Sequence, residues 1–94
     1  MKRPDKESLK KMRKELFEGI DNGELTLGQA TRRMRKTLGM NRRVYAETIL
    51  KISHDALQDI ETEKGNPTLK TLQKVGKPFG LDVGFVRKEK EQAN

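Results

Sequence analysis

The chain has 94 residues, 37% of them charged, and its 21 Lys and Arg residues outnumber its 14 Asp and Glu residues to give a formal net charge of +7. This length fits one small domain, and the absence of cysteine together with a single histidine excludes a disulfide scaffold, a thiol nucleophile and a Cys- or His-based metal site. With no membrane-length apolar run and no secretory signal we expect a cytoplasmic protein, and the charge favours a polyanionic partner without choosing between DNA, RNA and an anionic membrane.

A first helix is predicted from Asp5 to Ile20, with Asp5 as its N-cap. Its apolar residues recur at helical spacing and form one stripe: Leu9, Met12, Leu16, Phe17 and Ile20. Basic residues occupy the opposite face. We expect the stripe to pack on the rest of the domain or on a second copy, in preference to a membrane surface.

Four more helices are predicted in the middle of the chain. Thr26 and Gln29 fit a capping box that opens the second helix, and Gly39 is suited to end it. The third helix follows Asn41, the fourth begins at the N-cap Ser53, and the fifth is capped by the segment Asn66-Pro67-Thr68.

The C-terminal segment shows a different pattern. Leu81, Val83 and Phe85 alternate with other residues, which predicts a short strand. One strand cannot form a sheet alone, so we expect it to pair with another chain. The chain then divides into an N-terminal helical arm (1–24), a helical domain (25–80) and a C-terminal strand and tail (81–94).

Two short helices, 41–50 and 53–62, are separated by a tight turn and followed by a capped helix, as in a helix-turn-helix. Residues 27–85 resemble the repressor/Cro-type (XRE-like) helix-turn-helix regulators. The resemblance rests on these residues: Arg35, Gly39, Ala46, Ser53, Leu57, Ile60, Glu61, the segment Gly65-Asn66-Pro67-Thr68-Leu69, Leu72, and the segment Phe79-Gly80-Leu81. It implies an all-α, five-helix repressor-like domain that binds double-stranded DNA, here with an extra N-terminal helix and a C-terminal strand used in dimerisation.

The stretch from Gly80 to Arg87 is similar to a subgroup that includes antitoxins of toxin–antitoxin pairs. The subgroup implies dimerisation through a terminal strand, here carried by Leu81, Val83 and Phe85, and a toxin protein as a possible partner.

The chain departs from the family pattern at two turns. One residue more than usual separates Ala46 from Ser53, and Leu50 and Lys51 stand where a glycine is common. We therefore expect the fourth helix to be rotated or shifted. Glu63 also stands where a glycine is common, and Gly65 is expected to take the left-handed conformation instead.

The resemblance implies an ion pair between Arg35 and Glu61 that locks two helices together; the alternative is two solvated surface charges. It also places base-reading residues on the fourth helix: Ser53, His54, Asp55, Gln58 and Asp59. Gln can bond adenine at two atoms and Asp can accept from the cytosine amino group. Asp55 can equally serve the helix dipole. Residues 53–63 contain no Lys or Arg, which is unusual beside phosphates.

Positive charge is concentrated elsewhere. Six Lys and Arg residues and no acid fall within residues 32–43. Arg42 and Arg43 open the third helix, where helix N-termini suit anions, and Lys51 and Lys64 flank the fourth. These four are the expected phosphate contacts, with Arg32, Arg33 and Lys36 as further candidates. The alternative is a solvated basic face.

The sequence thus predicts a repressor-like transcriptional regulator that binds a palindromic operator as a homodimer. The alternative is an antitoxin that neutralises a toxin and regulates its own operon. No nucleophile–base–acid set, P-loop or metal spacing is present, so we expect no enzyme, no cofactor and no metal.

Overall fold

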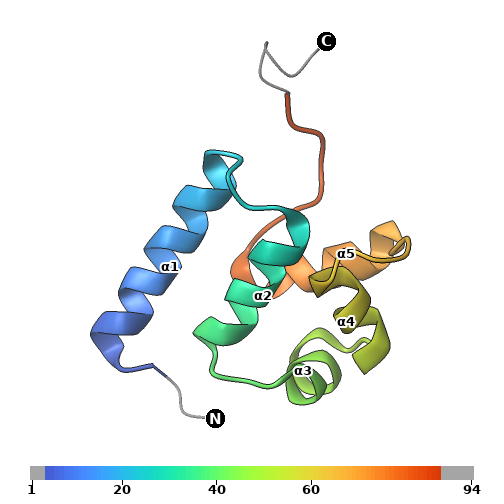
Figure 1. The fold of residues 1–94 in the computed structure, drawn as a ribbon, viewed down its shortest axis with the longest axis horizontal. Coiled ribbons are helices and arrows are strands. Elements are labelled where there is room, and N and C mark those ends of the chain that lie inside the picture. The colour runs from blue at the N-terminus through green and yellow to red at the C-terminus, as the bar shows by residue number, and fades with distance from the viewer. Residues whose placement is uncertain (1–3, 88–94) are drawn as a thin grey trace.

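Five helices follow one another along residues 4–87, the part of the chain that the computed structural model describes (Figure 1). They are α1 (Lys6–Asp21), α2 (Leu27–Thr37), α3 (Arg42–Val44), α4 (His54–Glu61) and α5 (Leu69–Gly76). α3 continues as a π-helix at Tyr45–Leu50, and α5 continues as a 3-10 helix at Lys77–Phe79. The all-α prediction with five helices is confirmed. The outer ends of the predicted arm and tail, residues 1–3 and 88–94, lie outside the described residues.

Each helix begins at a polar N-cap. The capping side chains accept a hydrogen bond from the backbone N–H three residues further on, and they belong to Asp5, Thr26, Asn41, Ser53 and Thr68. Thr26 and Gln29 form the complete capping box. The predicted helix starts are confirmed because these short side chains satisfy backbone donors that the helix leaves free.

One hydrophobic core joins all these elements. The buried apolar residues are Leu16, Ala30, Met34, Tyr45, Ala46, Leu50, Leu57, Ile60, Val75 and Phe79. α1 takes part through the fully buried Leu16, and its Phe17 ring lies 6.5 Å from the Phe79 ring, centroid to centroid. The apolar stripe of α1 therefore packs on the body of the domain. No helix within residues 4–87 is long and apolar enough to cross a membrane.

The predicted C-terminal strand is not found in the structure. Residues 81–87 are extended, but none of them belongs to a strand. The reason is that a strand needs a partner to share backbone hydrogen bonds, and no strand lies within residues 4–87 to provide one. Leu81 is half-buried against the chain's own core, while Val83 and Phe85 are exposed.

The extra residue before α4 lies inside a helix. Residues 45–50 form a π-helical turn, and the Ala46 carbonyl accepts hydrogen bonds from the N–H groups of both Lys51 and Ile52. A π-turn holds one more residue than an α-turn, so the helix widens to take up the insertion. Lys51 then closes it in the left-handed conformation, with φ at 60°.

The second turn also differs from the prediction. Glu63 itself takes a left-handed conformation with φ at 60°, and Gly65 takes one as well, with φ at 72°. The expectation that Gly65 replaces Glu63 in this role is therefore wrong. A side chain costs energy in this region of φ and ψ, so contacts of Glu63 must compensate for it.

Candidate nucleic-acid interface

α4 has one buried face and one open face. Leu57 and Ile60 enter the core, while Asp55, Gln58 and Asp59 are exposed. The Ser53 hydroxyl is engaged as the N-cap, where it accepts from the Ala56 N–H. The open face thus carries three of the predicted base-reading side chains.

His54 is less available than its neighbours on α4. Its side chain is 27% exposed, and Nδ1 lies 3.3 Å from Oδ1 of Asp55, whose side chain is 94% exposed. Asp55 therefore holds a first-turn position, next to the helix N-terminus, and points into solvent. Both of its predicted roles, base contact and dipole partner, are compatible with this placement.

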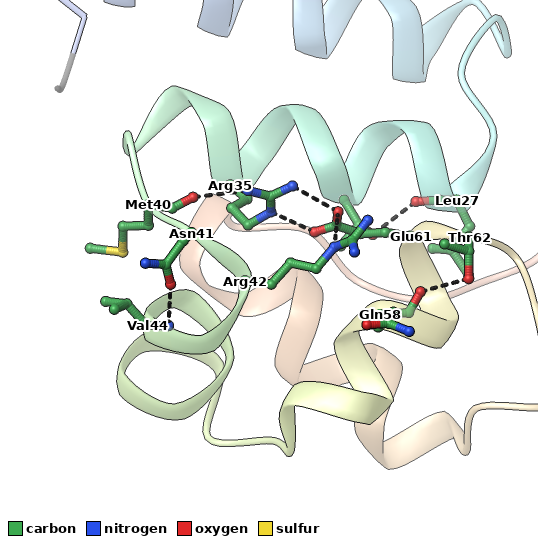
Figure 2. Close-up of polar contacts among 10 residues, drawn as sticks. Leu27, Arg35, Met40, Asn41, Arg42, Val44, Gln58, Glu61 and Thr62 are labelled. Carbon is green, nitrogen blue, oxygen red and sulfur yellow. Dashed lines mark hydrogen bonds and ion pairs between the residues drawn. The ribbon is translucent and has the colours of Figure 1, made fainter. Parts of the chain in front are cut away.

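A buried carboxylate fixes α4 to two other helices (Figure 2). Oε2 of Glu61 accepts from Nε of Arg35 at 2.7 Å, and Oε1 accepts from a terminal nitrogen of Arg35 at 2.9 Å. Arg35 also donates to the Met40 carbonyl at 3.0 Å, and Nε of Arg42 donates to Oε1 of Glu61 at 3.1 Å. The structure therefore brings Arg35 and Glu61 together, and it adds Arg42 to the pair.

This cluster is shielded from water. The Glu61 side chain is 0% exposed and that of Arg35 is 8% exposed. Burial opposes ionisation of Glu61, but hydrogen bonds and charges from Arg35 and Arg42 outweigh it and hold the pKa of Glu61 below its ordinary value. Paired in this way, the cluster sets the orientation of α4 against α2 and α3.

Arg42 and Arg43 both have protein partners, in contrast to the free phosphate contacts expected from the sequence. Arg42 is bonded to Glu61 through Nε and remains 31% exposed. Arg43 forms an exposed pair with Glu47, one turn further along the helix, at 3.2 Å. The sequence could not show this for Arg42, because Glu61 reaches it only through the fold.

Lys51 and Lys64 flank α4 at its two ends. Lys51 is exposed in the turn before α4, and its carbonyl accepts from Nζ of Lys74 at 3.4 Å. Lys64 is exposed after α4, where its backbone N–H donates to the Asp59 carbonyl at 2.8 Å. Both ammonium groups are placed to reach a polyanion that follows α4.

The other basic residues of α2 face a different part of the molecule. Arg32, Arg33 and Lys36 line a cavity of about 710 Å³ between α1 and α2, whose other wall includes Glu15 and Glu18. The basic run of the sequence is thus opposed by acids from α1. This arrangement favours the reading of these three residues as a solvated face.

Sequence reasoning missed a second contact between α2 and α4. The Thr26 hydroxyl donates to Oε2 of Glu63 while it caps α2. A Cβ atom on Gly28 would lie 2.7 Å from Cγ of Glu63 and 2.8 Å from the Ile60 carbonyl oxygen, so this close approach requires glycine. The departure of Glu63 from the family pattern was the one available signal.

Tyr45 is a buried residue whose environment the sequence did not predict. Its hydroxyl has no hydrogen-bond partner among the residues that the structure describes. Burial raises the pKa of Tyr45 to about 12, and the negative charge of Glu61 acts in the same direction. The side chain is a neutral core group beside the ion pair.

Comparison with protein families gives one match, to a helix-turn-helix family, over residues 32–86. This stretch begins inside α2, includes α3, α4 and α5, and leaves α1 outside it. Comparison with curated proteins and with solved structures gives no match. With more than half of its length matched, and with α3, the turn at Lys51 and α4 in the expected order, the chain belongs to the Cro/C1-type helix-turn-helix family of DNA-binding regulators, which are not enzymes.

Proposed function

We propose that the chain is a sequence-specific, repressor-like transcriptional regulator that binds a palindromic operator as a homodimer. The observation that carries the proposal is the open face of α4, with Asp55, Gln58 and Asp59 exposed while Glu61 holds the helix in place. A rigid helix with one uncovered polar face is what the major groove accepts.

The side chains on this face favour particular bases. Asp55 and Asp59 are four residues apart, a rise of about 6 Å along the helix. Ionised carboxylates only accept hydrogen bonds, so they favour the amino groups of cytosine and adenine and repel the O6 and N7 acceptors of guanine. Gln58 can both donate and accept, as adenine requires. The half-site is therefore expected to present amino groups to α4.

Positive charge for the phosphates comes from the ends of α4 and the start of α3. Arg43, Lys51 and Lys64 are exposed, and Arg42 is partly so. Arg43 exchanges its surface pair with Glu47 for a phosphate at little cost, because exposed ion pairs are weak. These contacts supply affinity and position, while the α4 face supplies sequence preference.

The test is a footprint on the DNA just upstream of the chain's own gene, followed by affinity measurements over a salt series. Arg43→Ala is expected to weaken binding to every sequence and to lower the slope of log affinity against log salt by about one. Gln58→Ala and Asp59→Asn are expected to change which sequence is preferred. Lys10→Ala on α1 is the matched control and should change neither.

Arg42→Ala requires a second measurement, because Arg42 also bonds Glu61. The variant is expected to lose affinity for all sequences, and its unfolding curve separates lost phosphate contact from lost stability. If Arg42→Ala and Gln58→Ala both leave operator affinity unchanged, the placement of the motif is wrong.

An antitoxin is the second candidate function. The observation that favours it is α1, a helix of 16 residues that lies outside the matched family region and offers a surface beyond DNA binding. Such a chain would bind and silence a toxin, with DNA binding serving autoregulation. Stable co-purification with the product of a neighbouring small open reading frame supports this function, and recovery of the chain alone opposes it.

A further inference from the structure

An apolar groove lies between α2, α5 and the extended segment that follows them. Its volume is about 500 Å³, and its apolar lining includes Leu27, Met34, Leu72, Leu81, Val83 and Val86. The one charged residue in the lining is Asp82. In a chain that is 37% charged, a groove with this lining is an unusual surface.

The segment beside the groove, residues 83–86, carries uncovered apolar side chains. Phe85 and Val86 are 107% and 90% exposed, and Val83 is 41% exposed. No backbone hydrogen bond of residues 82–87 is found within the described part of the chain. We call residues 83–86 the arm. An exposed phenylalanine on an extended arm gains free energy from any apolar site that it can reach.

We propose that two copies exchange arms, so that Phe85 of each copy occupies the groove of the other. This inference rests on the proposed homodimer and replaces the predicted strand pairing with docking of side chains. The arm's own groove does not take Phe85, because Val83 and Val86 of the same arm form part of its wall while Phe85 remains exposed. The second copy supplies both a groove and an arm.

Charge favours a second copy at this place. Two copies with a formal charge of +7 each repel one another, so they associate most readily where charge is missing. The uncharged stretch 25–31 contributes to the groove, and the arm itself is uncharged. The exchange is self-complementary and closes at two copies, so each contact occurs twice.

The position of the arm is compatible with DNA binding. In Figure 1 the C-terminal segment rises at one end of the molecule, while α3 and α4 lie at the other. Pairing through the arms therefore leaves the open face of α4 uncovered. One molecule can hold its partner and its operator together.

The absence of cysteine makes a direct test possible, because every introduced thiol is the only one in its chain. One preparation carries Leu27→Cys in the groove and a second carries Phe85→Cys on the arm. They are mixed, oxidised and analysed by mass spectrometry. A disulfide between the two variants joins different molecules by construction. Both positions are exposed, Leu27 to 51%, so the fold should tolerate the changes.

The expected result is a hetero-disulfide between Leu27→Cys and Phe85→Cys chains. The matched control pairs Phe85→Cys with Val44→Cys, since Val44 is an exposed apolar residue of α3, 43% accessible and outside the groove. A hetero-disulfide with the control at equal yield, or none with Leu27→Cys, overturns the proposal.

Association of the unmodified chain gives a second readout. Phe85→Ala is expected to raise the dimer dissociation constant at least about a hundredfold, because two rings are lost per dimer and a buried aromatic anchor is worth at least tenfold. Thr48→Ala, on the surface of the π-helix, should not change it. A monomeric wild-type chain overturns the inference and leaves the groove to another protein. DNA affinity of the same samples tests the proposed function separately, since a monomer can still bind a half-site.

Discussion

The Glu61 carboxylate offers the most direct test of how α4 is held in place, through the substitution Glu61→Gln. The wild-type carboxylate accepts two hydrogen bonds from Arg35 and one from Arg42, and its side chain is 0% exposed. Glutamine keeps the shape and one acceptor oxygen but removes the charge. Arg35, 8% exposed, is then left without a counter-charge.

Breaking a buried ion pair from one side costs about 3–5 kcal/mol. Glu61→Gln is expected near the lower figure, because its amide oxygen still accepts one bond, and Glu61→Ala near the upper one. A domain of this size unfolds with about 5–15 kcal/mol, so either loss is a large fraction of the total. The loss is measured by urea unfolding followed by far-UV circular dichroism.

Glu47→Gln provides the matched control for this measurement. It removes the carboxylate of the other arginine pair, in which Arg43 and Glu47 are 67% and 55% exposed. An exposed pair of this kind is worth at most about 1 kcal/mol. If Glu61→Gln costs no more than Glu47→Gln, the buried cluster does not stabilise the arrangement of α2, α3 and α4.

The same residue predicts a dependence on pH. The pKa of Glu61 is lower in the folded state than its ordinary value of 4.5, so the unfolded chain binds this proton more tightly. The contribution of Glu61 is therefore fully present above about pH 4.5 and is lost as pH falls through the folded-state pKa. The unfolding free energy of Glu61→Gln should fall less steeply over this acidic range than that of the wild type.

Three further substitutions test backbone strain, close packing and burial through thermal or urea unfolding. Lys51→Gly is expected to raise the unfolding free energy by up to about 1 kcal/mol, because Lys51 has a φ of 60°; an unchanged value would show that the turn is unstrained. Gly28→Ala should cost about 1–3 kcal/mol, since its Cβ meets Glu63 and the Ile60 carbonyl, and a stabilised variant would contradict this contact. Tyr45→Phe should be at least as stable as the wild type, because the lost hydroxyl is buried without a protein partner. It should also remove a loss of stability as pH rises from 10 to about 12, which follows from the raised pKa of Tyr45; a persisting alkaline loss would assign it to other groups.

Local signals predicted the helices well. Asp5, Thr26, Asn41, Ser53 and Thr68 mark the five starts, because capping depends on residues only three positions apart. These signals need no knowledge of the tertiary fold, so one sequence was enough to locate the helices.

Contacts between distant residues were predicted only where the family resemblance supplied them. Arg35 and Glu61 were paired in this way, but the bond from Arg42 to Glu61 and the bond from Thr26 to Glu63 were not foreseen. Each joins residues on different elements, 19 and 37 positions apart, and no local pattern encodes such a distance. The base-reading and phosphate-contacting roles of the site residues stay predictions until DNA binding is measured.

The predicted strand shows the opposite limit. Alternation of Leu81, Val83 and Phe85 correctly indicated an extended segment, but strand formation depends on a partner, which one chain does not encode locally. The side chains instead divide between the core, in the case of Leu81, and solvent, in the case of Phe85.

The π-helical turn of Tyr45–Leu50 decides how this chain must be aligned with other members of its family. A gap opened for its additional residue belongs inside that turn, and a gap placed at Lys51 would shift the correspondence of the preceding positions by one. Numbering counted forward from Ser53 is then unaffected, so operator contacts mapped in any relative transfer to α4 without an offset. Contacts mapped to the second half of the preceding helix, such as those at Thr48, transfer only after this correction.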